Sequence, residues 1–168
     1  MSNTASGYVP CPNTDQILAG LEFHYGIPPS AFDDLRFWSR MDSGVVSLAP
    51  ADHEPGDGVY ESFGMMMVRR DDHPAAAGTA FVRRFGHLAT RNTVQLEGAA
   101  LANYLQGLPV DSGVADERRG FVIVVGPHGP VGRGLWRRDD ERMWLLSELA
   151  KPYRHLPEST TDSTEAPA

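Results

Sequence analysis

Cysteine is almost missing from this chain of 168 residues, because Cys11 is the single one. One cysteine excludes an internal disulfide and every zinc site built mainly from cysteines. No stretch approaches 18 uninterrupted apolar residues, so the sequence predicts no membrane-spanning helix and no membrane partner. The first residues carry neither a basic start nor an apolar run, so we expect no secretory signal and a cytoplasmic protein.

Lysine is equally rare, since Lys151 is the single lysine among 15 basic residues. An acidic, lysine-poor composition is typical of proteins from a high-salt cytoplasm, and a GC-rich genome produces it as well. The charge is divided unevenly: residues 1–61 carry −7, residues 69–155 carry +3 and residues 156–168 carry −3. This division favours an anionic partner for the middle of the chain, with a solvated charged surface as the alternative.

The order of predicted elements indicates an α+β fold in two units. We expect a flexible segment over residues 1–12, a small α/β unit over 13–74, a unit richer in β-structure over 75–156 and a disordered acidic tail over 157–168. Helices are predicted from Asn13 or Thr14 to Gly26, and over 30–38, 79–85 and 98–106. Strands are predicted over 45–48, 63–69, 93–96, 120–125 and 130–136, while residues 143–149 fit a strand or a helical turn.

Catalytic motifs find little support in the residues. The six histidines have none of the spacings of a metal site, and no glycine-rich loop matches a nucleotide-binding fingerprint. Cys11 lies between two prolines near a terminus that we expect to be frayed. We therefore expect no catalytic residue, no metal and no cofactor, although a small enzyme using Cys11 or a histidine is kept as the least favoured hypothesis.

Arginine-rich segments suit binding better. Arginine and asparagine contact phosphates and base edges, and histidine can stack on an unpaired base. Paired glycines in a strand let another backbone or a phosphate chain approach closely. The candidate RNA-binding residues fall into three clusters, which must share one face: Arg83, Arg84, His87, Thr90, Arg91 and Asn92; Gly132, Arg133, Gly134, Arg137 and Arg138; and Lys151 with Arg154.

Four stretches in the same order resemble a known family. Residues 23–38, 84–92 (Arg-Phe-Gly-His-Leu-Ala-Thr-Arg-Asn), 120–135 and 151–154 resemble the C-terminal region of RNA cytosine-5 methyltransferases of the Nop/Sun type, and related stand-alone proteins grouped under ribosome biogenesis. The resemblance implies a PUA-like RNA-binding β-barrel after a small α/β unit. It also implies that Arg84, His87, Thr90, Arg91, Asn92, Gly132, Arg133 and Gly134 occupy motif positions.

The family's cofactor-binding loop and its Pro-Cys catalytic motif are absent from this sequence. The resemblance therefore implies RNA binding without the methyl-transfer chemistry. We expect a non-catalytic protein that binds structured RNA (rRNA or tRNA), accessory to RNA modification or ribosome biogenesis, with an RNA methyltransferase or a ribosomal protein as a further partner. The alternative is a protein-interaction module that docks through its acidic N-terminal face.

Overall fold

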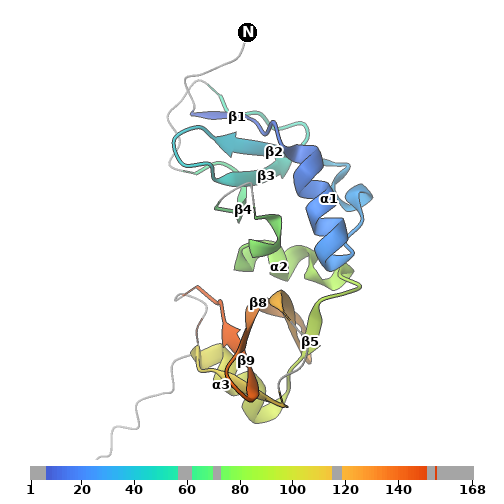
Figure 1. Cartoon of the computed structure of the whole chain (residues 1–168). Helices are drawn as coiled ribbons and strands as arrows, with labels where there is room; N and C mark the ends of the chain where they lie inside the picture. Colours follow the sequence, from blue (N-terminus) through green and yellow to red (C-terminus); the bar gives the residue numbers. More distant parts are fainter. Residues whose placement is uncertain (1–6, 57–61, 70–72, 115–118, 151–153, 155–168) are drawn as a thin grey trace, which may run out of the picture.

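The computed structural model describes residues 7–56, 62–69, 73–114, 119–150 and 154. Within these ranges the chain forms three α-helices and two β-sheets, which is an α+β fold (Figure 1). A four-stranded sheet lies at one end of the molecule and a curled five-stranded sheet at the other, with a helix between them. Among the helices of these ranges, none combines the length and the apolar character needed to cross a membrane.

The first sheet is antiparallel throughout, and helix α1 (Thr14–Tyr25) covers one of its faces. Residues Ile17, Leu21 and Tyr25 of α1 are fully buried against it. Asn13 precedes the helix and Gly26 ends it with φ of 68°, a left-handed conformation that glycine adopts without strain, so the predicted bounds are confirmed. The strands, in spatial order, are β1 (Tyr8–Pro10), β2 (Leu35–Arg40), β3 (Val46–Pro50) and β4 (Met65–Val68).

Two predictions for this region are wrong. The helix expected over 30–38 is a 3₁₀ turn, η2 (Pro29–Phe32), followed by strand β2. Its apolar spacing imitates a helix because β2 is buried on both faces, with Phe37 in the core beside α1 and Trp38 packed with Tyr8 on the opposite face. The segment expected to be flexible over 1–12 includes β1, and the Cys11 amide donates to the carbonyl oxygen of Phe37 (2.9 Å), so residues 8–11 are held in the sheet.

The second sheet is curled, and helix α3 (Gly98–Gln106), whose predicted bounds are also confirmed, packs on it through Tyr104. The Tyr104 hydroxyl donates to the carbonyl oxygen of Arg133 (2.8 Å), which fixes the helix against the sheet. Residues 143–149, left open by the sequence, begin as a strand. In spatial order the strands are β5 (Thr93–Gln95), β7 (Gly120–Gly126), β8 (Gly129–Arg138), β9 (Arg142–Ser147) and β6 (Val110–Val114).

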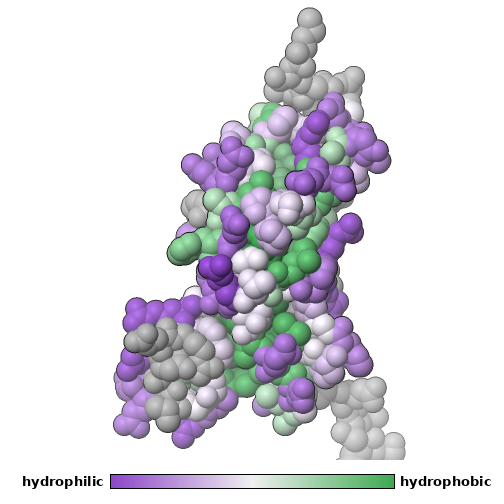
Figure 2. Space-filling view, turned by 90° about the vertical axis from the view of Figure 1, so that its right-hand side faces the viewer, coloured by the Kyte–Doolittle hydropathy of each residue, from purple (hydrophilic) through white to green (hydrophobic). Residues whose placement is uncertain are grey.

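Helix α2 (Thr79–Phe85), which also has its predicted bounds, lies between the two sheets and packs on β4 and β8. Its residues Phe81 and Phe85 share one hydrophobic cluster with Ile123 of β7. On the side shown in Figure 2, hydrophobic residues reach the surface in the middle of the molecule, between hydrophilic patches. The predicted division near residue 74 therefore precedes a helix that joins both units, and the predicted tail over 157–168 lies outside the described residues.

Candidate nucleic-acid interface

One side of α2 carries two of the arginines singled out in the sequence. Phe81, Val82 and Phe85 are buried, whereas Ala80, Arg83, Arg84 and, in the following 3₁₀ turn η4 (Gly86–Leu88), His87 are exposed. Residues three and four apart lie on the same side of a helix. We call this exposed row, Ala80, Arg83, Arg84 and His87, the α2 ridge.

The α2 ridge is positively charged because its segment contains no acid. Residues 73–96 include three arginines and no aspartate or glutamate. Arg83 Nε donates to the carbonyl oxygen of Val131 (3.1 Å), and the Arg84 guanidinium lies 5.6 Å from the centre of the Phe85 ring. Both guanidinium groups are thus placed along the outside of the junction between the sheets.

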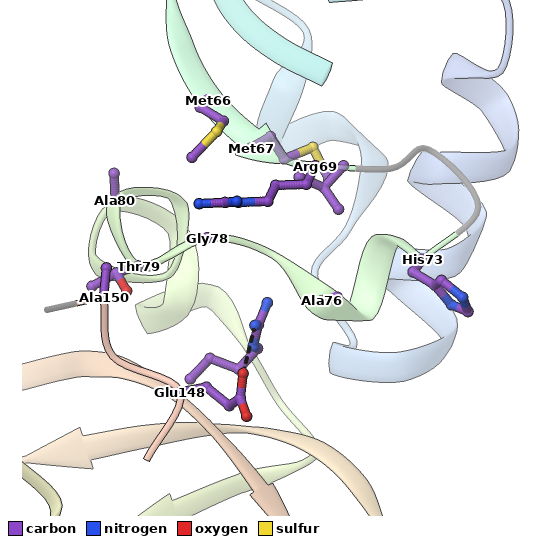
Figure 3. A pocket seen from close by; sticks show the side chains of 12 residues that line it. Met66, Met67, Arg69, His73, Ala76, Gly78, Thr79, Ala80, Glu148 and Ala150 are labelled. Carbon is purple, nitrogen blue, oxygen red and sulfur yellow. Dashed lines mark hydrogen bonds and ion pairs between the residues drawn. The ribbon is translucent and has the colours of Figure 1, made fainter. Parts of the chain in front are cut away.

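A cavity of about 590 Å³ opens beside the start of α2 (Figure 3). Strand β4 and Arg69 form one wall, residues 76–80 form another, and Arg133 with Glu148 from the second sheet form the floor. Figure 3 shows the Arg69 side chain between β4 and α2, whereas the His73 ring points away. We call this space the junction cavity. Ala80 belongs to both the junction cavity and the α2 ridge, so the two surfaces are continuous.

Arg133, a predicted RNA contact, is largely used by the fold. Its Nη1 donates to the carbonyl oxygen of Ala77 (2.9 Å), its Nη2 pairs with Glu148 (3.2 Å), and its guanidinium lies 4.5 Å from the centre of the Phe121 ring. The side chain is only 15% exposed, and the buried Nε has no hydrogen-bond partner within the described structure. Arg133 therefore joins the second sheet to the segment before α2 and contributes to the floor of the junction cavity.

Thr90, Arg91 and Asn92 contact the C-terminal end of α1. The amides of Thr90 and Arg91 donate to Tyr25, and Asn92 Nδ2 donates to the carbonyl oxygen of His24 (2.6 Å). Carbonyls of a last helical turn lack partners inside the helix, so this segment supplies them. These bonds occupy the Asn92 amide group that the sequence assigned to base contacts, whereas the Arg91 side chain remains exposed beside Phe23, which is 81% exposed.

Gly132 and Gly134 face the protein's own core. A Cβ atom at Gly132 would lie 2.5 Å from Leu149 Cδ2, and one at Gly134 would lie 2.6 Å from Leu145 Cδ1. The missing side chains therefore make room for Leu149, Tyr104 and Leu145 inside the curled sheet. The interpretation that these glycines leave room for RNA is wrong on this side of the strand.

The remaining predicted residues lie away from the junction cavity. Arg137 and Arg138 are exposed near the end of β8, about 13 Å from Arg133 at the usual rise of a strand. They border a separate groove of about 450 Å³ with Trp144. Arg154 Nε donates to the carbonyl oxygen of Leu149 (3.1 Å), and Lys151 lies outside the described residues. The three clusters are therefore not placed on one surface: Arg83, Arg84 and His87 lie on the α2 ridge, Arg133 lies on the floor of the junction cavity, and Arg137 and Arg138 border a separate groove.

The sequence did not single out Arg69 and Glu148. Arg69 is the last residue of the strand expected over 63–69, but no local pattern shows that β4 is the edge strand beside α2. Glu148 is the partner of an arginine 15 residues earlier in the chain. Both assignments depend on long-range packing.

The junction cavity is lined by Arg69, Arg133 and Glu148 together with mostly apolar residues. Across the described ranges, no group of three or more histidine, cysteine or acidic side chains is close enough to hold a metal ion. Cys11 is buried in the core of the first sheet, away from the junction cavity. A scan against protein-family models and a search of curated protein sequences each found no match.

Proposed function

We propose that this chain is a non-catalytic RNA-binding protein that holds RNA along the α2 ridge. The observation that carries the proposal is the exposed arginine pair of the α2 ridge, Arg83 and Arg84, next to a cavity that Arg69 lines and that shares Ala80 with the ridge. Arginine is suited to phosphate because its planar fork donates two parallel hydrogen bonds. His87 adds a ring that can stack on an unpaired base.

The overall charge does not oppose this function. The protein carries −7, but surface charges farther apart than about 10 Å are largely screened at 0.1 M salt. A phosphate on the α2 ridge therefore interacts mainly with Arg83, Arg84 and their neighbours, and the segment around them contains no acid.

The class of RNA is part of the same proposal. A curled five-stranded sheet with α3 packed against it is the arrangement we propose to be PUA-like, in keeping with the sequence resemblance. The protein would then act on rRNA or tRNA, as an accessory to a modification enzyme or to ribosome assembly. An RNA methyltransferase or a ribosomal protein is the further partner that this role requires.

Photocrosslinking tests the proposed site. A pool of single-stranded RNA 12-mers containing 4-thiouridine is irradiated with the protein at low salt, and the modified peptides are mapped by mass spectrometry. We expect adducts within residues 79–91. Adducts confined to the groove of Arg137 and Trp144 would show that RNA binds there and not on the α2 ridge. The absence of any RNA-dependent adduct would refute RNA binding.

A second candidate function is a protein-interaction module, and one observation favours it. The two arginines of the first sheet are already ion-paired, Arg36 with Glu54 (2.7 Å) and Arg40 with Asp42 (2.9 Å). Acids such as Asp33 and Asp34 therefore leave this end of the molecule negatively charged. Protein partners that remain bound in a pull-down after nuclease treatment would support docking on a basic protein.

A further inference from the structure

The junction cavity has the size and the lining of a ligand site. Its volume of about 590 Å³ lies within the usual range for small-molecule sites, roughly 300–1,000 Å³. The walls are mostly apolar, with Met66 and Met67 on one side and Ala76 and Ala80 on the other. Such walls favour a flat, partly apolar group over an inorganic ion.

Arg69 supplies a planar cation at this cavity. Its side chain lies between β4 and α2 (Figure 3), and it makes no hydrogen bond or ion pair with any residue that the structure describes. A guanidinium plane stacks on nucleobases in RNA-binding proteins, and the contact does not depend on which base is present. Arg69 is therefore free to cover one face of a base that enters the junction cavity.

Glu148 supplies a hydrogen-bond acceptor on the floor. Its side chain is 35% exposed and bonds to Arg133 through one oxygen, Oε2. An ionised carboxylate has about four acceptor positions and no donor, so Glu148 keeps most of its capacity. Carboxylates accept hydrogen bonds from the amino group of cytosine. Uracil has a carbonyl oxygen at the same position, which a carboxylate repels.

We propose that the junction cavity takes one unpaired base of the bound RNA and selects bases with an exocyclic amino group over uracil. This assignment rests on the proposed function, because phosphates on the α2 ridge bring the RNA past the shared residue Ala80. In this arrangement Arg69 stacks on the base, Glu148 accepts from its amino group, and Arg133 holds Glu148 in place. The ridge provides affinity and the cavity provides the preference for one base over another.

Two RNAs of equal length and charge test the preference. Fluorescein-labelled single-stranded C12 and U12 differ in the group at position 4 of each base, and their affinities are measured by fluorescence anisotropy at low salt. We expect the protein to bind C12 about tenfold more tightly than U12, which is the order of one base contact. Ala80→Leu fills the cavity mouth and should remove this preference by weakening C12 binding. Ala102→Leu, on an exposed position of α3, is the matched control and should keep it.

A second variant tests the role of Glu148 on the floor of the junction cavity. Glu148→Gln replaces an acceptor with a group that also donates, so C12 should lose its advantage while U12 affinity is retained; urea unfolding confirms that the variant is folded. Equal binding of C12 and U12 by the wild type, or a preference unchanged in Ala80→Leu, would overturn the base site while RNA binding itself stands. Failure of both RNAs to bind would instead refute the proposed function. Free cytidine 5′-monophosphate binding as tightly as C12 would show a free-nucleotide site and would also overturn the assignment.

Discussion

At the scale of single residues, Arg133 shows how one side chain can resemble an RNA contact in sequence and yet hold the fold. Its contacts with Glu148 and Phe121 lie within the unit of the second sheet, and its hydrogen bond to the Ala77 carbonyl connects that unit to the segment before α2. We predict that Arg133→Ala lowers the free energy of unfolding by about 2–3 kcal/mol, because Glu148 and the Ala77 carbonyl lose their partner in a partly buried site. Urea unfolding monitored by tryptophan fluorescence measures the change.

Arg36→Ala is the control for that experiment. Arg36 pairs with Glu54 at the surface, where both side chains are substantially exposed. Surface pairs contribute little, so the expected loss is within about 0.5 kcal/mol. Similar losses in the two variants would show that Arg133 is not a structural link between the second sheet and the segment before α2.

Two buried tyrosines should make the free energy of unfolding depend on pH in the alkaline range. Burial raises the pKa of Tyr25 and Tyr104 above the ordinary value, and the positive charge of Arg133 opposes this only in part. Below about pH 10 each phenol is neutral in both the folded and the unfolded chain, so neither affects the pH dependence. Above that pH only the unfolded chain loses these protons, and the free energy of unfolding falls by up to about 1.4 kcal/mol per pH unit for each tyrosine.

Urea unfolding between pH 9 and 11 checks this slope. Tyr104→Phe begins less stable than the wild type because the bond to the Arg133 carbonyl is lost. Its stability should then decline less steeply with pH, since one titrating phenol has been removed. A variant as steep as the wild type would mean that Tyr104 ionises in the folded protein.

At the scale of elements, the segment Thr90–Asn92 completes helix α1. Asn92 has a positive φ of 50° and donates to the His24 carbonyl at the helix end. Asn92→Gly keeps the backbone relaxed and loses the hydrogen bond, so we predict a loss of about 1 kcal/mol. Asn92→Ala adds left-handed strain to the same loss, for a total of about 2 kcal/mol. Equal losses of stability in Asn92→Gly and Asn92→Ala, measured by urea unfolding, would show that the left-handed backbone at position 92 causes no strain in alanine.

The helices and strand β2 show what the sequence could and could not predict. The bounds of α1, α2 and α3 followed from local signals such as Gly26 and Gly107, whose positive φ ends a helix. Strand β2 was mistaken for a helix because Phe37 and Trp38 are buried on opposite faces. Local patterns show which residues are apolar, but they do not show how many layers cover a strand.

The prediction for the two glycines of β8 was wrong for a related reason. The sequence predicts that other groups can approach a strand closely at Gly132 and Gly134, and the structure confirms such a close approach. The sequence cannot say whether the approaching group is RNA or the protein's own Leu149. The group that approaches these glycines is set by the packing of α3 and Leu149 against the curled second sheet. That packing depends on contacts between residues far apart in the chain.

At the scale of the whole molecule, the two sheets meet around α2 and bring distant charges together. Arg69 directly follows β4 and lines the junction cavity together with Arg133 of β8, while Arg83 and Arg84 lie on α2 beside it. The sequence predicted a basic middle region and four of its residues, the ridge residues Arg83, Arg84 and His87 together with Arg133. It could not predict that Arg137 and Arg138 lie farther along β8, nor that Arg69 joins the group.

The central claim is that RNA phosphates bind to the arginines of the α2 ridge, and the salt dependence of RNA affinity tests it most directly. For single strands, each neutralised phosphate contributes a slope of about −0.7 in log affinity against log salt. Arg83→Gln/Arg84→Gln should therefore reduce the steepness of the slope by about 1.4. Arg36→Gln/Arg40→Gln changes the charge equally on the first sheet and should leave the slope unchanged. Equal slopes in the wild type and the ridge variant would contradict the account.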